Sequence, residues 1–264
     1  MTSVHLLNIS FFLGLLTVWL PAWSQSEVPE LVTDRPDQTE SSGVVPLRTL
    51  QIETGLVMTV DRNDQTQFRR FTYNSTLLRY GLLENFELRA GLEYLSEKEK
   101  MLENGDQSAL TGFSPIYLGF KTRITEERGW IPEIAFLGGL SLSFTAKKEF
   151  RALHPAAIMR FAFTHTLTDR FSFGYNLGAE WEGESGPGYF YSGVLGIGLT
   201  ETLGMFVEPF GILATENVNE HLLDAGLTWL VLPNLQLDLS GGVGLNEAAS
   251  DYFISVGLSY RIPE

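Results

Sequence analysis

The chain has 264 residues, 18 Lys and Arg against 32 Asp and Glu, a formal net charge of −14 and no cysteine. Binding a phosphate backbone requires clustered Lys and Arg, so this charge excludes nucleic acid as an expected partner. The lack of cysteine excludes disulfides, thiol chemistry, cysteine-based zinc sites and lipoprotein acylation.

The first 24 residues have the features of an export signal. They carry no Lys, Arg, Asp or Glu, and the apolar run from Leu6 to Leu20 is shorter than the ~20 residues that a spanning helix needs. The small residues Ala22 and Ser24 offer a cleavage site for signal peptidase. We therefore predict a signal peptide over residues 1–24 and a mature chain from about Gln25; a retained membrane anchor is the alternative.

A polar leader, residues 25–48, separates the signal from the first predicted strand. It contains the stretch "TDRPDQTESSGVVPLR", which is rich in charges and turn formers and has no hydrophobic period. One interpretation is a periplasmic linker. The other is that Asp34, Arg35, Pro36 and Asp37 fold back into the periplasmic mouth of the following domain and pair with charges there, as a plug or gate.

From residue 49 onward the dominant pattern is alternation with a period of two. In "FELRAGLEY" (86–94) every second residue from Phe86 is apolar, and Glu87, Arg89 and Glu93 fall on the opposite face. The same alternation recurs to the C-terminus. It predicts strands at 49–60, 68–80, 86–94, 114–124, 132–144, 154–167, 171–182, 189–200, 205–214, 221–231, 235–245 and 252–262.

The predicted strands are too long for an ordinary soluble sheet, where strands centre on about 5–6 residues, and they match the ~9–11 residues that cross a bilayer at a tilt. The predicted connections alternate between longer and shorter, as between the outer loops and periplasmic turns of transmembrane barrels. A soluble β-sandwich also alternates, but its solvent face would be richer in Lys, Glu and Thr and poorer in Gly. The predicted fold is all-β: a transmembrane antiparallel β-barrel over residues 49–264, with about 12 strands in an up-and-down meander.

The polar faces of these strands supply candidate lumen-lining residues, because charges are costly against lipid and tolerable against water or each other. One interpretation is an aqueous path whose selectivity these charges set. The other is a paired network that fills a narrow, closed barrel. The candidates are Glu53, Arg79, Glu87, Arg89, Glu93, Lys121, Arg123, Glu133, Arg160, Glu180, Glu208, Asp224, Asp238 and Arg261.

Catalytic chemistry has little support in the sequence. A barrel hydrolase needs a serine next to a histidine base, and the mature chain offers only His154, His165 and His221, without a G-x-S-x-G motif. The fragments "DRND" and "ENGDQ" lack the spacing of a calcium-binding loop. We expect no enzyme activity, no catalytic residues, no cofactor and no metal site; an outer-membrane lipid hydrolase is kept as an alternative.

The leader also carries a family resemblance. The run from Thr33 to Ser41, the "VP" at 45–46 and "QIETG" at 51–55 resemble the start of the phenol-degradation MetA-pathway family, outer-membrane β-barrels commonly labelled transporters. The segments "YNSTLLRYGLLENFELRAG", "FVEPFG" and "DAGLTWLVLPNLQLDLSGGVGLNEAASDYFISVGLSYR" look like the same family. The chain departs from the family where Leu47–Arg48 follow "VP", because a glycine often stands there.

The resemblance implies passage of small, aromatic or hydrophobic compounds, and it brings no catalytic or substrate-binding residues. We therefore expect a monomeric, passive channel exported to the bacterial outer membrane. Its expected partners are outer-membrane lipid, small-molecule solutes and the barrel-assembly machinery. The alternative is a closed-lumen barrel with a structural or surface-interaction role.

Overall fold

The structure is a computed structural model that describes residues 29–184 and 186–262. The predicted signal peptide lies outside these residues. The described residues form one antiparallel sheet and two short 3-10 helices, η1 (Ser143–Thr145) and η2 (Lys148–Phe150). The strands are β1 (Leu50–Arg62), β2 (Thr66–Leu83), β3 (Phe86–Met101), β4 (Gln107–Phe113), β5 (Ile116–Thr125), β6 (Glu133–Leu142), β7 (Ala156–Thr166), β8 (Phe171–Trp181), β9 (Gly188–Gly198), β10 (Leu203–Ala214), β11 (Glu220–Leu232), β12 (Leu235–Gly244) and β13 (Tyr252–Arg261).

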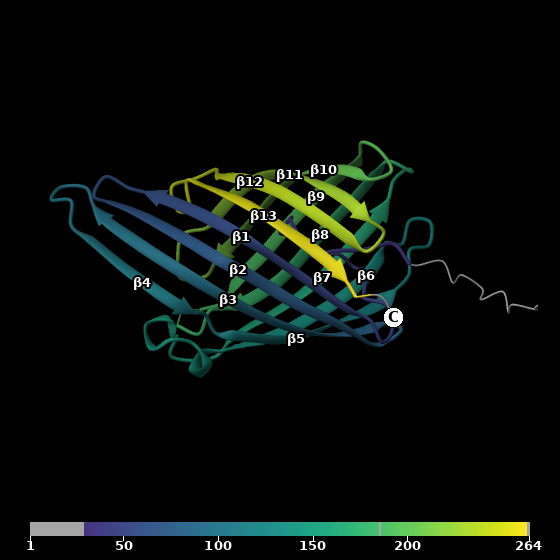
Figure 1. The fold of residues 1–264 in the computed structure, drawn as a ribbon, viewed down its shortest axis with the longest axis horizontal. Helices are drawn as coiled ribbons and strands as arrows, with labels where there is room; N and C mark the ends of the chain where they lie inside the picture. The colour runs from purple at the N-terminus through teal and green to yellow at the C-terminus, as the bar shows by residue number, and fades with distance from the viewer. Residues whose placement is uncertain (1–28, 185, 263–264) are drawn as a thin grey trace, which may run out of the picture.

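The sheet closes on itself as a barrel (Figure 1). Strands pair with their neighbours in the chain from β5 to β13, β13 pairs with β1, and β2 and β3 complete the ring. The first residues of β3, from Phe86 to Gly91, pair with β5, so the ring closes without β4. The prediction of a meandering antiparallel barrel of about 12 strands is confirmed.

One predicted loop is instead part of the sheet. The segment 95–113, expected as an outer loop, extends β3 to Met101 and then returns as β4. The sequence pattern misses this hairpin because both of its faces are mostly polar. Its two strands are joined by pairs such as Thr111 with Ser96, whose hydroxyls lie 3.2 Å apart, and Arg70 of β2 pairs with Glu97 of β3 at 2.7 Å. Pro115 lacks an N–H and ends β4, so the strand predicted from residue 114 begins at Ile116.

The outside of the barrel is an apolar belt. Leu56, Leu118, Leu140, Leu177 and Leu239, on five different strands, are each about half exposed. A monomeric soluble protein rarely exposes a contiguous apolar surface of this kind, whereas a lipid-facing barrel requires it. A closed barrel also pairs its backbone groups without a free edge, as a bilayer demands. The protein is therefore an outer-membrane β-barrel. Among the described residues, no helix is long and apolar enough to cross a membrane.

The two ends of the barrel differ. At the end that carries the C-terminus (Figure 1), the connections are 84–85, 126–132, 167–170, 199–202 and 233–234. At the other end they are 63–65, 102–106, 143–155, 182–187, 215–219 and 245–251, and β2 to β4 project furthest. Short turns are periplasmic and longer loops extracellular in outer-membrane barrels, so the C-terminus lies on the periplasmic side.

Candidate functional site

Residues 29–47, which we call the strap, run through the periplasmic half of the barrel. The strap starts beside β13, where the Glu30 carbonyl accepts a bond of 3.0 Å from Arg261. It returns to β3, where Val45 donates its N–H to Glu87 over 2.8 Å, and ends at a bridge between Leu47 and Gly81. Figure 1 shows it in purple at the end of the barrel that carries the C-terminus.

Asp34 fastens the strap to a basic wall of the lumen. Its carboxylate accepts bonds from Lys121 (2.7 Å) and Arg89 (3.1 Å) and lies 3.1 Å from Arg79. Burial alone would raise the pKa of Asp34, but the charges of these three cations outweigh it and hold the pKa well below the usual range. Asp34 therefore stays ionised, and strands β2, β3 and β5 share one counter-ion supplied by the strap.

Arg79 is the centre of this network and is fully buried. It bonds Glu87 at 2.9 Å and Glu53 at 2.9 Å, and it donates to the Gly43 carbonyl of the strap over 3.0 Å. A buried guanidinium is tolerable only when its donors are paired, because desolvation costs several kcal/mol per ion. The strap supplies part of that pairing, so the barrel wall and the strap depend on each other.

Arg35 fastens the strap to strands β12 and β13, on the other side of β1 from the basic wall. Its guanidinium lies 3.0 Å from Asp238 and donates to Ser255 over 2.9 Å. Two glycines paired across β1 and β13 form its seat. A Cβ atom would lie 2.4 Å from the guanidinium at Gly55 and 2.3 Å from it at Gly257. These glycines leave the space that the arginine occupies.

The tip of the strap reaches the middle of the barrel. The Thr39 hydroxyl lies 2.6 Å from that of Ser192 and also bonds Glu208. Glu40 and Asn176 exchange two bonds: the Glu40 N–H donates to the amide oxygen over 2.8 Å, and the amide donates to the Glu40 carbonyl over 3.0 Å. The irregular backbone of the tip is thus paired with side chains of β8, β9 and β10, as a buried segment requires.

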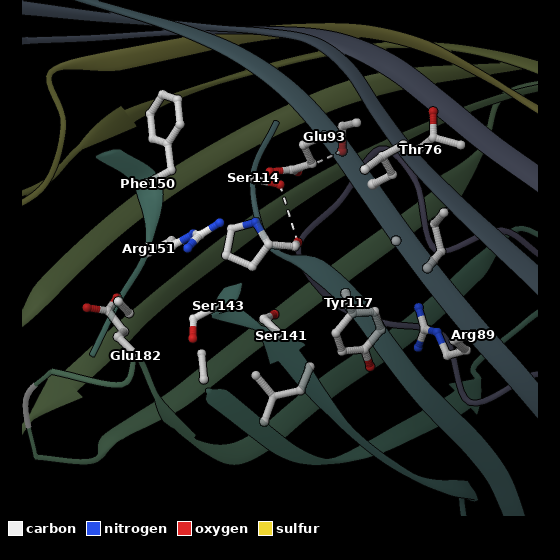
Figure 2. A pocket seen from close by; sticks show the side chains of 18 of the residues that line it. Thr76, Arg89, Glu93, Ser114, Tyr117, Ser141, Ser143, Phe150, Arg151 and Glu182 are labelled. Carbon is white, nitrogen blue, oxygen red and sulfur yellow. Dashed lines mark hydrogen bonds between the residues drawn. The ribbon is translucent and has the colours of Figure 1, made fainter. Parts of the chain in front are cut away.

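The strap divides the interior into cavities. The outermost, of about 850 Å³, is shown in Figure 2, where Tyr117 and Arg89 lie toward one side and Phe150 and Arg151 toward the other. A second, of about 540 Å³, has several lining residues in common with it and ends on the strap. A third, of about 470 Å³, lies on the periplasmic side. The segment 35–37 lines both the second and the third.

The predicted lumen residues fall into three groups. Those in contact with the strap are Glu53, Arg79, Glu87, Arg89, Lys121, Glu133, Glu208, Asp238 and Arg261. Two pairs form along the wall: Arg160 with Glu180 at 3.0 Å, and Arg123 with Glu133 at 3.5 Å. Glu93 bonds Ser75 in the outermost cavity, and Asp224 is buried beside Glu208.

The sequence-based prediction missed the neutral partners of the strap. Ser42 bonds Thr164 at 2.7 Å, and Gln236 donates to Thr33 over 3.0 Å. The prediction weighed only charged residues on the polar faces of the strands. Neutral hydrogen-bonding side chains at the same alternating positions were the available signal.

Among the described residues, no hydrogen bond joins a histidine side chain to a serine. His221 bonds the Tyr191 hydroxyl at 2.7 Å, and His165 stacks on Tyr175 with ring centroids 6.1 Å apart. His154 lies in the connection before β7 and lines the outermost cavity. Within residues 29–184 and 186–262, no group of three or more His, Asp or Glu side chains is arranged to hold a metal ion.

Residues 33–262 match the family model described as "Putative MetA-pathway of phenol degradation". The chain belongs to this family. The match begins at Thr33 in the strap and ends after β13, so it covers most of the strap and the whole barrel. A comparison with curated protein sequences gives no match.

Solved outer-membrane barrels share the fold at low sequence identity. The COG4313 outer membrane channel from Pseudomonas putida F1 has a TM-score of 0.64 at 11% identity, covering 83% of this chain and 97% of that one. The transport unit of the autotransporter AIDA-I from Escherichia coli gives 0.54 at 9%, covering 82% and 90%. The KdgM porin gives 0.51 at 13%, covering 80% and 98%. At these identities the likeness establishes the fold.

Proposed function

We propose that the protein is a passive outer-membrane channel for small solutes whose periplasmic mouth is closed by the strap. The observation that carries this proposal is the partition at residues 35–37, which separates an outer cavity from a periplasmic one. Because the partition is a single segment of chain held by side-chain bonds, its displacement would join the two cavities. The barrel wall would not have to change.

The lining of the outermost cavity supports a ring-bearing solute. Tyr117 lies flat against the wall, so that a Cβ atom at Gly119 or Gly139 would lie 2.2 or 2.3 Å from its side chain. Aromatic faces stack on flat apolar rings, and the hydroxyls of Ser141 and Ser143 nearby can bond polar substituents. The family description, which refers to phenol degradation, points to the same chemical class.

The closed-lumen barrel remains the second candidate, because the buried bonds of the strap favour a permanently closed state. On that view the strap is a core that fills the barrel, and the cavities on its two sides never connect. The two candidates differ in whether the strap is ever displaced, which conductance measures directly.

The bonding of the histidines and of the lumen carboxylates also fits transport better than catalysis. His221 is engaged by Tyr191, and the lumen carboxylates are mostly paired with cations or with the strap. We infer that the chain acts without a cofactor, as a monomer surrounded by outer-membrane lipid, after insertion by the barrel-assembly machinery. Its partners in function are the solutes that cross it.

The test is planar-bilayer conductance of the refolded mature protein and of a deletion of residues 33–41. The deletion removes Asp34, Arg35 and the tip of the strap. We expect wild-type protein to show brief openings and the deletion a larger, steady conductance. Deletion of the extracellular connection 102–106 serves as the control and should leave the wild-type behaviour unchanged. Absence of conductance in wild-type protein, together with conductance in the 33–41 deletion, would support the closed-lumen alternative.

A further inference from the structure

Three acidic residues lie together where the strap crosses the middle of the barrel. Glu208 on β10 and Asp224 on β11 are direct cross-strand partners, 0% and 2% exposed. Two buried carboxylates placed side by side cannot both ionise without a large cost, which favours a proton on one of them. Asp37 lies on the strap next to Gln38, whose N–H donates to Glu208 over 2.7 Å.

The surrounding protein gives Asp224 no other partner. Neither of its carboxylate oxygens receives a hydrogen bond from a described residue. Glu208 accepts from Thr39 and from the N–H of Gln38, the residue next to Asp37. Burial, with the charge of Glu208 next in importance, holds the pKa of Asp37 well above its usual range.

Asp37 lines the second cavity, and the three cations that also line this cavity are paired with other carboxylates. Arg35 pairs with Asp238, Arg70 with Glu97, and Arg160 with Glu180. Beyond β10, strands β9 and β8 present the neutral groups Ser192 and Asn176, and beyond β11, strand β12 presents Asp238, with which Arg35 pairs. Of the other carboxyl groups that line this cavity, Asp34, Glu40 and Glu53 are paired with Lys121, Arg89 and Arg79. Glu93 and Glu220 take part in no ion pair with a described residue.

We propose that Asp37, Glu208 and Asp224 form a proton-binding site that latches the strap in its closed position. The proposal rests on the proposed channel function. When the site holds its protons, the carboxyl groups can bond one another across the strap and the wall. When it loses them, two or three negative charges face each other in a confined space, and the Asp37 segment is repelled from β10 and β11.

The sign of the pH dependence follows from linkage. The docked strap holds a proton on Asp37 that a released, hydrated strap would give up near pH 4, the usual value for aspartate. The stabilisation is complete below that pH and is lost as the pH rises through the raised pKa of the docked state. The closed state is therefore favoured at low pH, and a single linked proton changes the ratio of open to closed states by at most about tenfold per pH unit.

The test is the open probability of single channels between pH 5 and pH 8.5. We expect it to rise with pH in wild-type protein. Asp37→Asn, which keeps the shape of the protonated acid and cannot ionise, should stay at the low-pH value throughout, and Glu208→Gln should flatten the profile in the same way. Glu201→Gln, at an exposed periplasmic turn, is the matched control and should keep the wild-type profile.

The deletion of residues 33–41 separates this proposal from the one on which it rests. The deletion variant should conduct at every pH, and its open probability should not increase as the pH rises. If the deletion conducts and Asp37→Asn still follows the wild-type profile, the latch proposal is wrong and the channel stands. If neither the deletion nor wild type conducts at any pH, the channel function itself fails.

Discussion

At the scale of single residues, the strap depends on a few side chains that serve two structures at once. Asp34 is the counter-ion of three lumen cations, and Arg79 binds both the wall and the strap. Removing one member of such a buried network leaves the others uncompensated, at a cost of roughly 3–5 kcal/mol. These residues could be named as candidates from the sequence, because they are charges on the polar faces of strands. Their pairing could not, because it depends on which strands become neighbours.

Arg48 adopts a backbone conformation with a structural cost. It directly follows the strap with φ of 60°, in the left-handed region, and donates its N–H to the Gly81 carbonyl over 2.7 Å. A residue with a Cβ pays roughly 1–2 kcal/mol there, which glycine avoids.

We predict that Arg48→Gly unfolds from lipid vesicles at a higher urea concentration than Arg48→Ala, by about 1 kcal/mol in the free energy of unfolding. The comparison removes the exposed arginine side chain from both variants, so only the backbone preference differs. Equal stability of the two variants would show that the turn is not strained.

At the scale of elements, the barrel was predictable, whereas folding of the leader into the lumen was only one of two interpretations that the sequence allowed. Alternation with a period of two survives in every strand that faces lipid on one side, so strands such as β8 and β13 were located to within a residue or so. The pattern fails where both faces are polar, as in the hairpin of β3 and β4 outside the bilayer. The strap has no period because its bonds go to side chains rather than to a ladder, and its conformation is set by contacts distant in the sequence.

The close contact of Arg35 with Gly55 on β1 and Gly257 on β13 predicts how a substitution there would change gating. The three atoms nearest to a Cβ atom at Gly257 all belong to the Arg35 guanidinium, at 2.3 to 2.6 Å, whereas a Cβ atom at Gly193 would meet Phe173 at an ordinary 3.8 Å. Gly257→Ala should push Arg35 away from Asp238 and raise the open probability at least about tenfold, since losing even 1.4 kcal/mol of a buried pair suffices. Single-channel recording checks this.

The matched control for the seat is Gly193→Ala, which should behave as wild type. An unchanged open probability in Gly257→Ala would mean that the Arg35 contact does not hold the gate.

At the scale of the whole molecule, the barrel, the strap and the cavities form one account of a gated pore. The exterior is apolar, the periplasmic half of the interior is a bonded network, and the extracellular half is open enough to hold a small solute. Strap bonds reach β1, β2, β3, β5 to β10, β12 and β13, so a rigid wall holds a short movable segment. In the proposed channel, movement of the strap opens the pore.

The most direct test of that claim is a reversible covalent lock on the strap. The chain has no cysteine, and the hydroxyl oxygens of Thr39 and Ser192 lie 2.6 Å apart, so cysteines at both positions fall within reach of a disulfide. Conductance of the Thr39→Cys, Ser192→Cys protein should be abolished on oxidation and restored by reductant, while each single variant conducts under both conditions. Undiminished conductance of the fully oxidised, disulfide-bonded protein would contradict the account.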